Sequence, residues 1–140
     1  MDFYGFYTGK IFDAYKYLGA HVEEKGVTFR TFAPSASRIT LIGEFNDWQE
    51  WEMNKVSDGN FWECYVPQAK AGQMYKYKIY DRNSNPVDHC DPYGFGMELR
   101  PSSTSIIRDM SKYKFKDSQW LQSRSDCRKK PLNIYEIHFG

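Results

Sequence analysis

The sequence predicts an all-β fold, an immunoglobulin-like antiparallel β-sandwich with a short N-terminal helix and a C-terminal extension. Apolar and polar residues alternate with a period of two in several segments, as side chains do on a half-buried strand. Turn-forming residues separate these segments at spacings of about ten to fifteen residues, and no helical pattern intervenes. Such spacing is typical of antiparallel sheets packed face to face.

Residues 1–20 are predicted to form an N-terminal segment with a short helix. Ile11, Phe12, Tyr15 and Leu18 have the spacing of residues on one face of a helix. After this segment the period changes from that of a helix to that of a strand.

The predicted sandwich spans residues 21–110. Its first clear strand, residues 27–33, alternates in polarity and follows the turn-forming residues Glu24, Lys25 and Gly26. Further turns are signalled at residues 58–60 and 71–72. The remaining predicted strands are residues 38–43, 61–66, 74–81 and 104–108.

Residues 111–140 are predicted to combine a linker with a single strand. The part up to residue 130 is polar and contains a basic cluster of Arg124, Arg128, Lys129 and Lys130. Residues 132–139 are nearly continuous in apolar side chains, which is typical of a strand buried on both faces in a parallel sheet. The sequence ends within this predicted strand, so we expect it to be truncated.

Composition limits the classes of partner. The chain has 140 residues, which suits one compact domain with an attached element. The 19 Lys and Arg residues nearly balance the 18 Asp and Glu residues, so nothing draws the whole chain to nucleic acid or a membrane surface. Aromatic residues make up 18% of the chain, more than a core of this size needs, and some rings are expected at the surface. A neutral partner is favoured.

Cysteine usage and the N-terminal sequence favour the cytoplasm. Cys64, Cys90 and Cys127 are odd in number and widely spaced, which predicts reduced thiols. Residues 1–4 are not a basic region followed by an apolar stretch, and no apolar run approaches the length of a membrane span, so we expect a cytoplasmic protein. His89, Cys90 and Asp91 are adjacent, but neighbours on an extended chain point apart, so no metal and no cofactor is expected.

Two motifs carry a family resemblance. Residues 26–36, GVTFRTFAPSA, and residues 41–48, LIGEFNDW, resemble the glycogen-binding modules of the CBM48 class, which precede the barrels of α-amylase-type enzymes. Three further segments are similar to the glycogen (1,4-α-glucan) branching enzymes of that family. They are DPYG at 91–94, LRP at 99–101 with SII at 105–107, and YEIHFG at 135–140, the last resembling the first barrel strand.

The resemblance implies a non-catalytic module. The parent enzyme would form α-1,6 branches by retaining transfer between two carboxylates about 5–5.5 Å apart. In the family these carboxylates lie on later barrel strands, so they would fall beyond Gly140 and this fragment would not be an enzyme. The implied partners are glycogen or another α-1,4-glucan and the catalytic barrel of the parent.

Three residues are candidates for carbohydrate binding, and the resemblance implies two of them. Trp48 matches the glycogen-binding tryptophan of related modules, although it could instead cap the core. Lys78 matches a sugar-contacting lysine; alternation turns it outward while Tyr75 and Tyr77 turn inward, although an outward lysine could equally be plain solvated surface. Asn46 is a weaker candidate, because an Asn at this place could simply cap a turn.

Departures from the family pattern predict weak binding. Residues 81–86 contain no second tryptophan, Thr104 stands where a sugar-binding Asn is expected, and alternation predicts a core role for Trp62. One stacked glucose buries on the order of 100 Å² of apolar surface, about 2.5 kcal/mol at most, so affinity near the millimolar range is expected. Two alternatives stay open. The module could only buttress the barrel through residues 91–93 and the linker, or it could belong to a debranching or other α-glucan enzyme.

Overall fold

A computed structural model describes the backbone of residues 1–140 and the side chains of residues 1–126 and 129–140. The predictions for the Cys127 thiol and for Arg128 therefore lie outside the described side chains. The chain divides into two compact units, Met1–Asp109 and Met110–Gly140. In the described part of the chain, no helix is long and apolar enough to cross a membrane.

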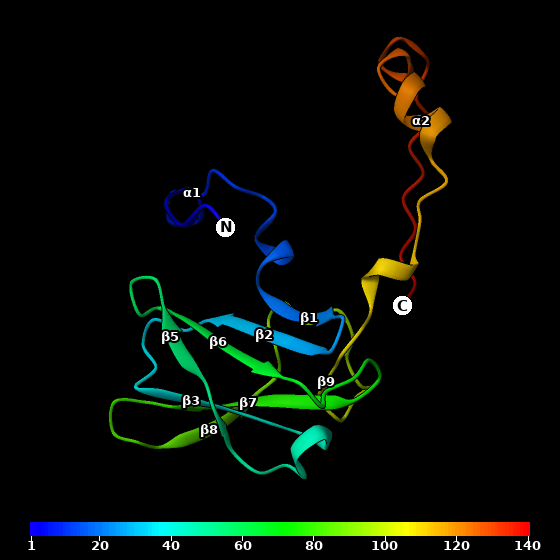
Figure 1. Cartoon of the computed structure of the whole chain (residues 1–140). Helices are drawn as coiled ribbons and strands as arrows, with labels where there is room; N and C mark the ends of the chain where they lie inside the picture. The colour runs from blue at the N-terminus through cyan, green and yellow to red at the C-terminus, as the bar shows by residue number, and fades with distance from the viewer. The chain divides into compact units, whose positions relative to one another are not determined.

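The first unit is a sandwich of two antiparallel sheets, as predicted (Figure 1). One sheet has the strand order β1-β2-β6-β5, and the other has the order β4-β3-β7-β8 with β9 also paired to β7. The strands of the first sheet are β1 (Gly19–Glu23), β2 (Gly26–Phe32), β6 (Phe61–Val66) and β5 (Asn54–Val56). Those of the second are β4 (Trp51–Glu52), β3 (Arg38–Gly43), β7 (Met74–Tyr80), β8 (Pro86–His89) and β9 (Ser105–Ile106).

The core lies between the two sheets and follows the predicted alternation. In β2, Phe29 stands opposite Ala20 of β1 and Cys64 of β6, and all three face inward. In β7, Tyr75 and Tyr77 are fully buried, as predicted, while the lysines between and after them are only half-buried. The cluster comprises Ala20, Val27, Phe29, Ile39, Leu41, Phe45, Met53, Trp62, Cys64, Val66, Ala69, Tyr75, Tyr77 and Ile107.

The N-terminal segment contains a short helix, but at other residues than predicted. The helix α1 (Phe3–Tyr7) begins after Asp2, whose side chain accepts a hydrogen bond from the Gly5 N–H. Residues 11–18 form only the 3-10 helix η1 (Ala14–Lys16), and Phe12 is 91% exposed, so the predicted apolar face is wrong. Packing decides the outcome, because the aromatic rings of α1 dock on the first sheet instead.

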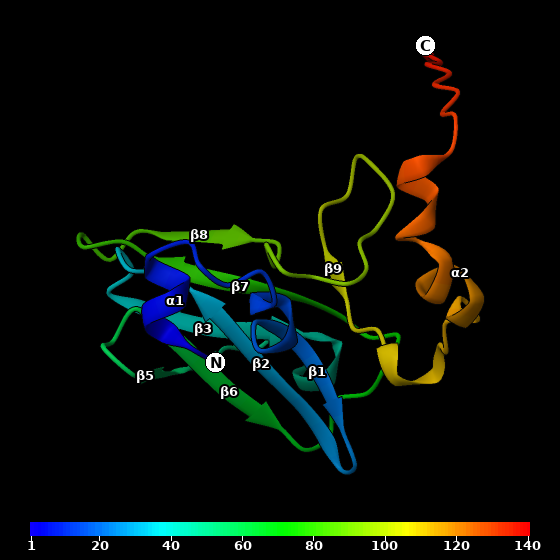
Figure 2. The same ribbon diagram turned by 90° about the horizontal axis from the view of Figure 1, so that it is seen from above.

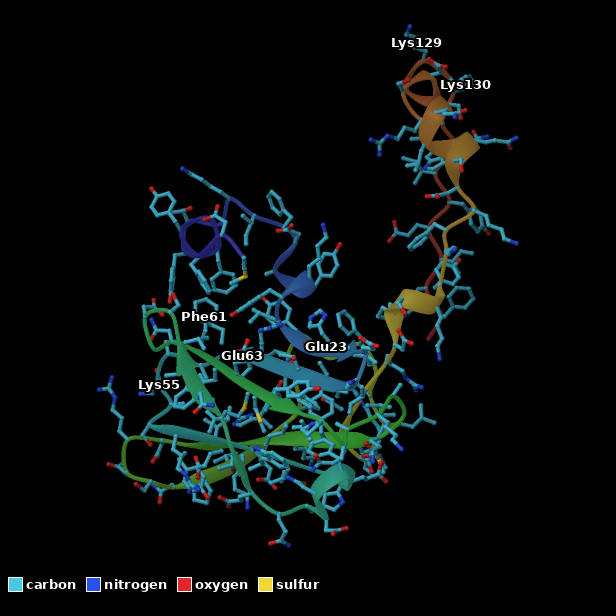
Figure 3. All side chains as sticks on the ribbon, viewed as in Figure 1. Glu23, Lys55, Phe61, Glu63, Lys129 and Lys130 are labelled. Carbon is cyan, nitrogen blue, oxygen red and sulfur yellow. The ribbon has the colours of Figure 1, made fainter. Side chains whose placement is uncertain are left out.

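The docking surface of α1 is the outer face of the first sheet. Phe61 of β6 is only 1% exposed although it points away from the core, because Phe3 and Phe6 cover it with ring centroids 4.8 and 5.3 Å away. Figure 2 shows α1 over the end of β2, and Figure 3 shows Phe61 on the side of β6 that faces α1. This layer accounts for part of the high aromatic content.

The second unit contains three short helical pieces. These are η3 (Met110–Lys112), α2 (Ser118–Ser123) and η4 (Asp126–Lys129), in the region predicted as a linker. Residues 132–139 form no strand, and Ile134, Tyr135 and Phe139 are exposed. The strand was predicted as part of a catalytic barrel, so it stays a prediction. A parallel-sheet strand needs neighbours on both sides to bond its backbone groups, and within the described chain it has none.

Candidate functional site

The turn that follows β3 holds two of the three predicted site residues. It contains the 3-10 helix η2 (Glu44–Asn46) and continues to Trp48. The Asn46 Oδ1 accepts a hydrogen bond from the Gly43 N–H at 3.0 Å, and its Nδ2 donates to the Leu41 carbonyl at 3.3 Å. Asn46 therefore shapes the turn, which was the alternative given for it, and has limited capacity left for a ligand.

Trp48 occupies an unusual backbone conformation at the tip of this turn. Asp47 and Trp48 have φ angles of 53° and 58°, in the left-handed region that bulky residues avoid. The Trp48 N–H donates to the Gly43 carbonyl at 2.9 Å, which fastens the turn to the end of β3. The side chain is 41% exposed, so the core does not enclose it. A strained backbone conformation of this kind persists only where the surrounding structure stabilises it, and it is often found at ligand sites.

Lys78 takes part in a charged network on the outer face of the second sheet. Its Nζ lies 3.3 Å from the Glu50 carboxylate, which also accepts a hydrogen bond from the Tyr80 hydroxyl at 2.7 Å. Arg38 lies 3.2 Å from the same carboxylate. The Tyr80 hydroxyl, then Lys78 and Arg38, lower the pKa of Glu50. Lys78 is thus held in place by a counter-ion, which occupies part of its hydrogen-bonding capacity.

Strand register distinguishes between the two outward lysines of β7. Lys78 stands opposite Thr40, whereas Lys76 stands opposite Ile42, next to the Gly43–Tyr75 pair. Because the Trp48 amide is bonded to Gly43, Lys76 is the outward lysine nearer the turn. Sequence reasoning singled out Lys78 and missed Lys76, since alternation places both on one face and register depends on the partner strand.

The remaining aromatic candidate is structural. Trp62 is buried in the core, and its Nε1 donates to the Ala33 carbonyl at 3.2 Å, as expected for a buried indole. The core role predicted from alternation with Cys64 and Val66 is confirmed.

The DPYG segment supplies a buried polar centre. The Asp91 carboxylate accepts hydrogen bonds from the hydroxyls of Tyr75 and Tyr77, at 2.7 and 3.1 Å, and from the Tyr93 N–H at 2.8 Å. Its own N–H donates to the Ser105 hydroxyl. Burial raises the pKa of Asp91 above its usual value, and it raises the pKa of both tyrosines. The segment therefore ties β7, β9 and the 91–94 turn together.

The described side chains contain no group of three His, Cys, Asp or Glu residues placed to hold a metal ion. What the turn offers instead is a partly exposed indole at Trp48, and Lys76 and Lys78 project outward from β7, the strand paired with β3. Such a surface suits an uncharged ligand with apolar faces and hydroxyl groups.

Comparison with known proteins identifies relatives over the whole chain. The family Carbohydrate-binding module 48 (Isoamylase N-terminal domain) matches residues 17–94. A 1,4-alpha-glucan branching enzyme GlgB of Fusobacterium nucleatum is 38% identical over 143 aligned residues, covering 100% of this chain and 23% of that protein. One of Dechloromonas aromatica is also 38% identical, covering 98% and 23%. The chain thus spans about a quarter of the length of these curated relatives.

Solved structures with the same fold include a pullulanase and a putative alpha amylase. A Klebsiella pneumoniae pullulanase complexed with maltotriose has a TM-score of 0.56 at 25% identity, covering 66% of this chain and 9% of that one. A putative alpha amylase from Salmonella typhimurium has a TM-score of 0.60 at 20% identity, covering 74% and 17%. The second match shows the fold alone.

Proposed function

We propose that this chain, which belongs to the carbohydrate-binding module 48 family, binds α-1,4-glucan as the non-catalytic module of a 1,4-α-glucan branching enzyme. The observation that carries the proposal is Trp48, half-exposed and held at positive φ in a turn of the family's segment. The rest of the longer protein would supply the barrel and the carboxylates, and we assign no catalytic residue to this chain.

The binding chemistry follows from the nature of a glucan. A glucose ring has an apolar C–H face that stacks on an indole, and hydroxyl groups that accept hydrogen bonds from amines. Trp48 would supply the platform, Lys76 and Lys78 the donors, and Asn46 the geometry of the turn. One platform contributes about 2.5 kcal/mol at most, so the single site would bind near the millimolar range. Glycogen offsets weak binding by presenting many chain ends.

Two alternatives have some support. A purely structural module would use the ordered 91–94 turn to support the barrel, and the hydrogen bonds around Asp91 suit that role. A debranching parent is favoured by the likeness to a pullulanase, at 25% identity. The branching enzymes match at 38% identity over the full chain, and we therefore prefer them.

Cellular location is proposed on the same basis. Cys64 and Cys90 are free thiols in the structure, which suits a reducing compartment such as the cytoplasm.

Affinity electrophoresis in gels containing glycogen tests the binding role. Trp48→Ala removes the platform, and we expect glycogen to retard the variant at least about tenfold more weakly, as a loss of about 1.4 kcal/mol or more implies. Trp120→Ala is the matched control, because Trp120 is 57% exposed in α2, in the other unit, and the same truncation there should leave retardation unchanged. Equal retardation of the Trp48 variant and the unmodified chain would favour the purely structural role.

A further inference from the structure

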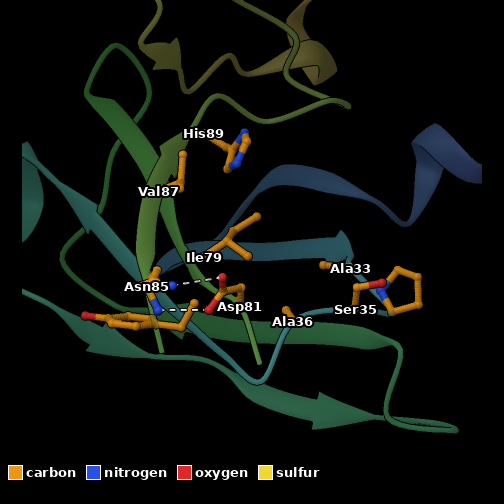
Figure 4. A pocket seen from close by; sticks show the side chains of 10 residues that line it. Ala33, Ser35, Ala36, Ile79, Asp81, Asn85, Val87 and His89 are labelled. Atoms are coloured by element: carbon orange, nitrogen blue, oxygen red, sulfur yellow. Dashed lines mark hydrogen bonds between the residues drawn. The ribbon is translucent and has the colours of Figure 1, made fainter. Parts of the chain in front are cut away.

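A small pocket opens at the opposite end of β3 from the Trp48 turn. One wall is the loop that follows β2, with Ala33, Pro34 and Ala36, and the other is the β7–β8 hairpin, with Ile79 and Val87 (Figure 4). Its volume is about 250 Å³. Since β3 runs for six residues from Arg38 to Gly43, the pocket and the turn are separated by roughly 17 Å of strand. One sugar ring could not contact both.

The walls of the pocket are held rigidly. Tyr80, which also lines it, is fixed at its hydroxyl by Glu50 and on one ring face by the Arg38 guanidinium, 4.7 Å from the ring centroid. The Asp81 carboxylate accepts hydrogen bonds from the backbone N–H groups of Asn83 and Asn85, at 2.8 and 2.9 Å. It also accepts one from the Asn85 side chain at 3.2 Å. A preformed wall reduces the ordering cost of binding.

Three further polar side chains line the pocket. In the described part of the chain, the Ser35 hydroxyl, the Asn85 Oδ1 and the His89 ring form no hydrogen bond with the protein, and all three residues line the pocket. The one acidic lining residue, Asp81, already accepts hydrogen bonds within its own turn, and its pKa is lowered because Asn85 and Asn83 donate to it. Apolar walls with a few free polar groups are typical of small-molecule sites.

We propose that this pocket binds a single glucose unit of an α-glucan, as a second contact separate from Trp48. The volume is below the roughly 300 Å³ at which pockets for drug-sized ligands begin, so it suits one ring. The apolar walls would cover a C–H face, and Ser35, Asn85 and His89 would exchange hydrogen bonds with hydroxyl groups. This inference rests on the proposed function, since it takes the same ligand class.

Ile79 and Val87 face the opposite side of the second sheet from Lys78, because Ile79 alternates in phase with the buried Tyr77 and pairs with Val87. A glucan in contact with both the pocket and Lys78 would therefore have to pass round an edge of the sheet, and a chain long enough to do so would present its units to the pocket at a high effective concentration. The pocket would thus compensate for the missing tryptophan in residues 81–86. A long oligosaccharide should gain more from it than a short one.

Amide shifts in ¹H–¹⁵N spectra of the 140-residue chain test the pocket, with maltotriose and maltoheptaose as probes. We expect the amides of Ala36, Val87 and His89 to shift with sugar and to saturate. Val87→Asp places a carboxylate in the pocket and should weaken these shifts at least about tenfold. Val87 is 54% exposed, so the change should not unfold the chain. Val22→Asp is the matched control on β1, where the valine is 37% exposed, and should leave the shifts unchanged.

The outcomes separate the two proposals. If sugar shifts the amides of residues 46–48 but not those of the pocket residues, the second site is contradicted and the proposed function is unaffected. If sugar shifts neither set of amides, both proposals are contradicted. Pocket shifts that sorbitol reproduces equally would show a general affinity for polyols and would overturn the assignment to glucose. Pocket shifts abolished by Val87→Asp, retained in Trp48→Ala and absent with sorbitol would support it.

Discussion

The carboxyl group of Asp91 is buried against the two tyrosines that fill the centre of β7. Burial raises its pKa, while the hydrogen bonds from Tyr75, Tyr93 and Tyr77 act in the opposite direction without cancelling the effect. With a folded pKa above the unfolded value of 3.8, the native state binds more protons than the unfolded state in the interval between them. The contribution of Asp91 to stability is therefore present below pH 3.8 and is lost as the pH rises through the folded pKa.

Asp91→Asn tests this linkage. The variant should be less stable by about 1–3 kcal/mol, because one carboxylate acceptor is replaced by an NH₂ group. Since Asn does not titrate, its deficit relative to the unmodified chain should be larger at about pH 4 than at about pH 7. Urea unfolding curves at the two pH values measure both quantities.

Asp58→Asn is a control for which the stability difference should change with pH in the opposite direction. The Tyr7 hydroxyl and the Asn60 amide groups donate to Asp58 and lower its pKa, so its contribution is present above pH 3.8 and is lost as the pH falls. The deficit of this variant should grow as the pH rises. If both variants showed the same trend, the assignment of the buried carboxyl would be wrong.

The helix α1 forms a third layer on the outer face of the first sheet. Phe6 lies 5.1 Å from the Phe32 ring and 5.3 Å from the Phe61 ring, and the Tyr7 hydroxyl donates to Asp58 in the turn before β6. A helix of five residues has no stability of its own, so these contacts hold it. The layer in turn removes Phe61 from water and covers part of Phe32.

Phe6→Ala should therefore lower the free energy of unfolding, although Phe6 is only half-buried. We expect a decrease of about 1–3 kcal/mol, less than for a fully buried Phe, and a fall in Tm of about 4–8 °C for each kcal/mol. Phe12→Ala is the matched control in the same segment, where the ring is 91% exposed and the change should stay within about 0.5 kcal/mol. Thermal unfolding measures both, and equal Tm shifts would contradict the docking of α1.

Sequence patterns correctly predicted the strands whose side chains alternate in polarity. They did not predict structure that depends on contacts with segments far away in the sequence. The strand from Met74 to Tyr80 and the inward direction of its tyrosines follow from period two. Residues 11–18 had helical spacing, but the aromatic rings that find a docking surface are those of Phe3 and Phe6. Residues 132–139 have the composition of a buried strand and no partner strand in the described chain.

The same limit applies to the candidate site. The motif made Trp48 a candidate, but its positive φ accompanies a backbone hydrogen bond from the turn to Gly43, which no propensity predicts. The choice between Lys76 and Lys78 required the register of β7 against β3. The pocket joins the loop after β2 to the β7–β8 hairpin, segments about fifty residues apart in the chain, so no local pattern indicates it.

The core cluster lies in one of the two units, and the other unit has several exposed apolar residues. Every member of the core cluster lies between Ala20 and Ile107, within the unit Met1–Asp109. In the other unit, Leu132, Ile134, Ile137 and Phe139 are exposed. Stability should therefore depend on the first unit, while the second adds apolar surface that favours association.

A chain ending at Asp109 should keep the stability of the whole. Because no core side chain is removed, we expect Tm to stay within about 4 °C of the 140-residue chain, and self-association in size-exclusion chromatography to decrease. Ile134→Asp in the full chain is the control, since it lowers the exposed apolar area without shortening the chain and should reduce association while leaving Tm unchanged. A fall in Tm of more than about 8 °C on truncation would mean that residues 110–140 contribute to the folding of the sandwich, and the two units would then have to be treated as one cooperative structure.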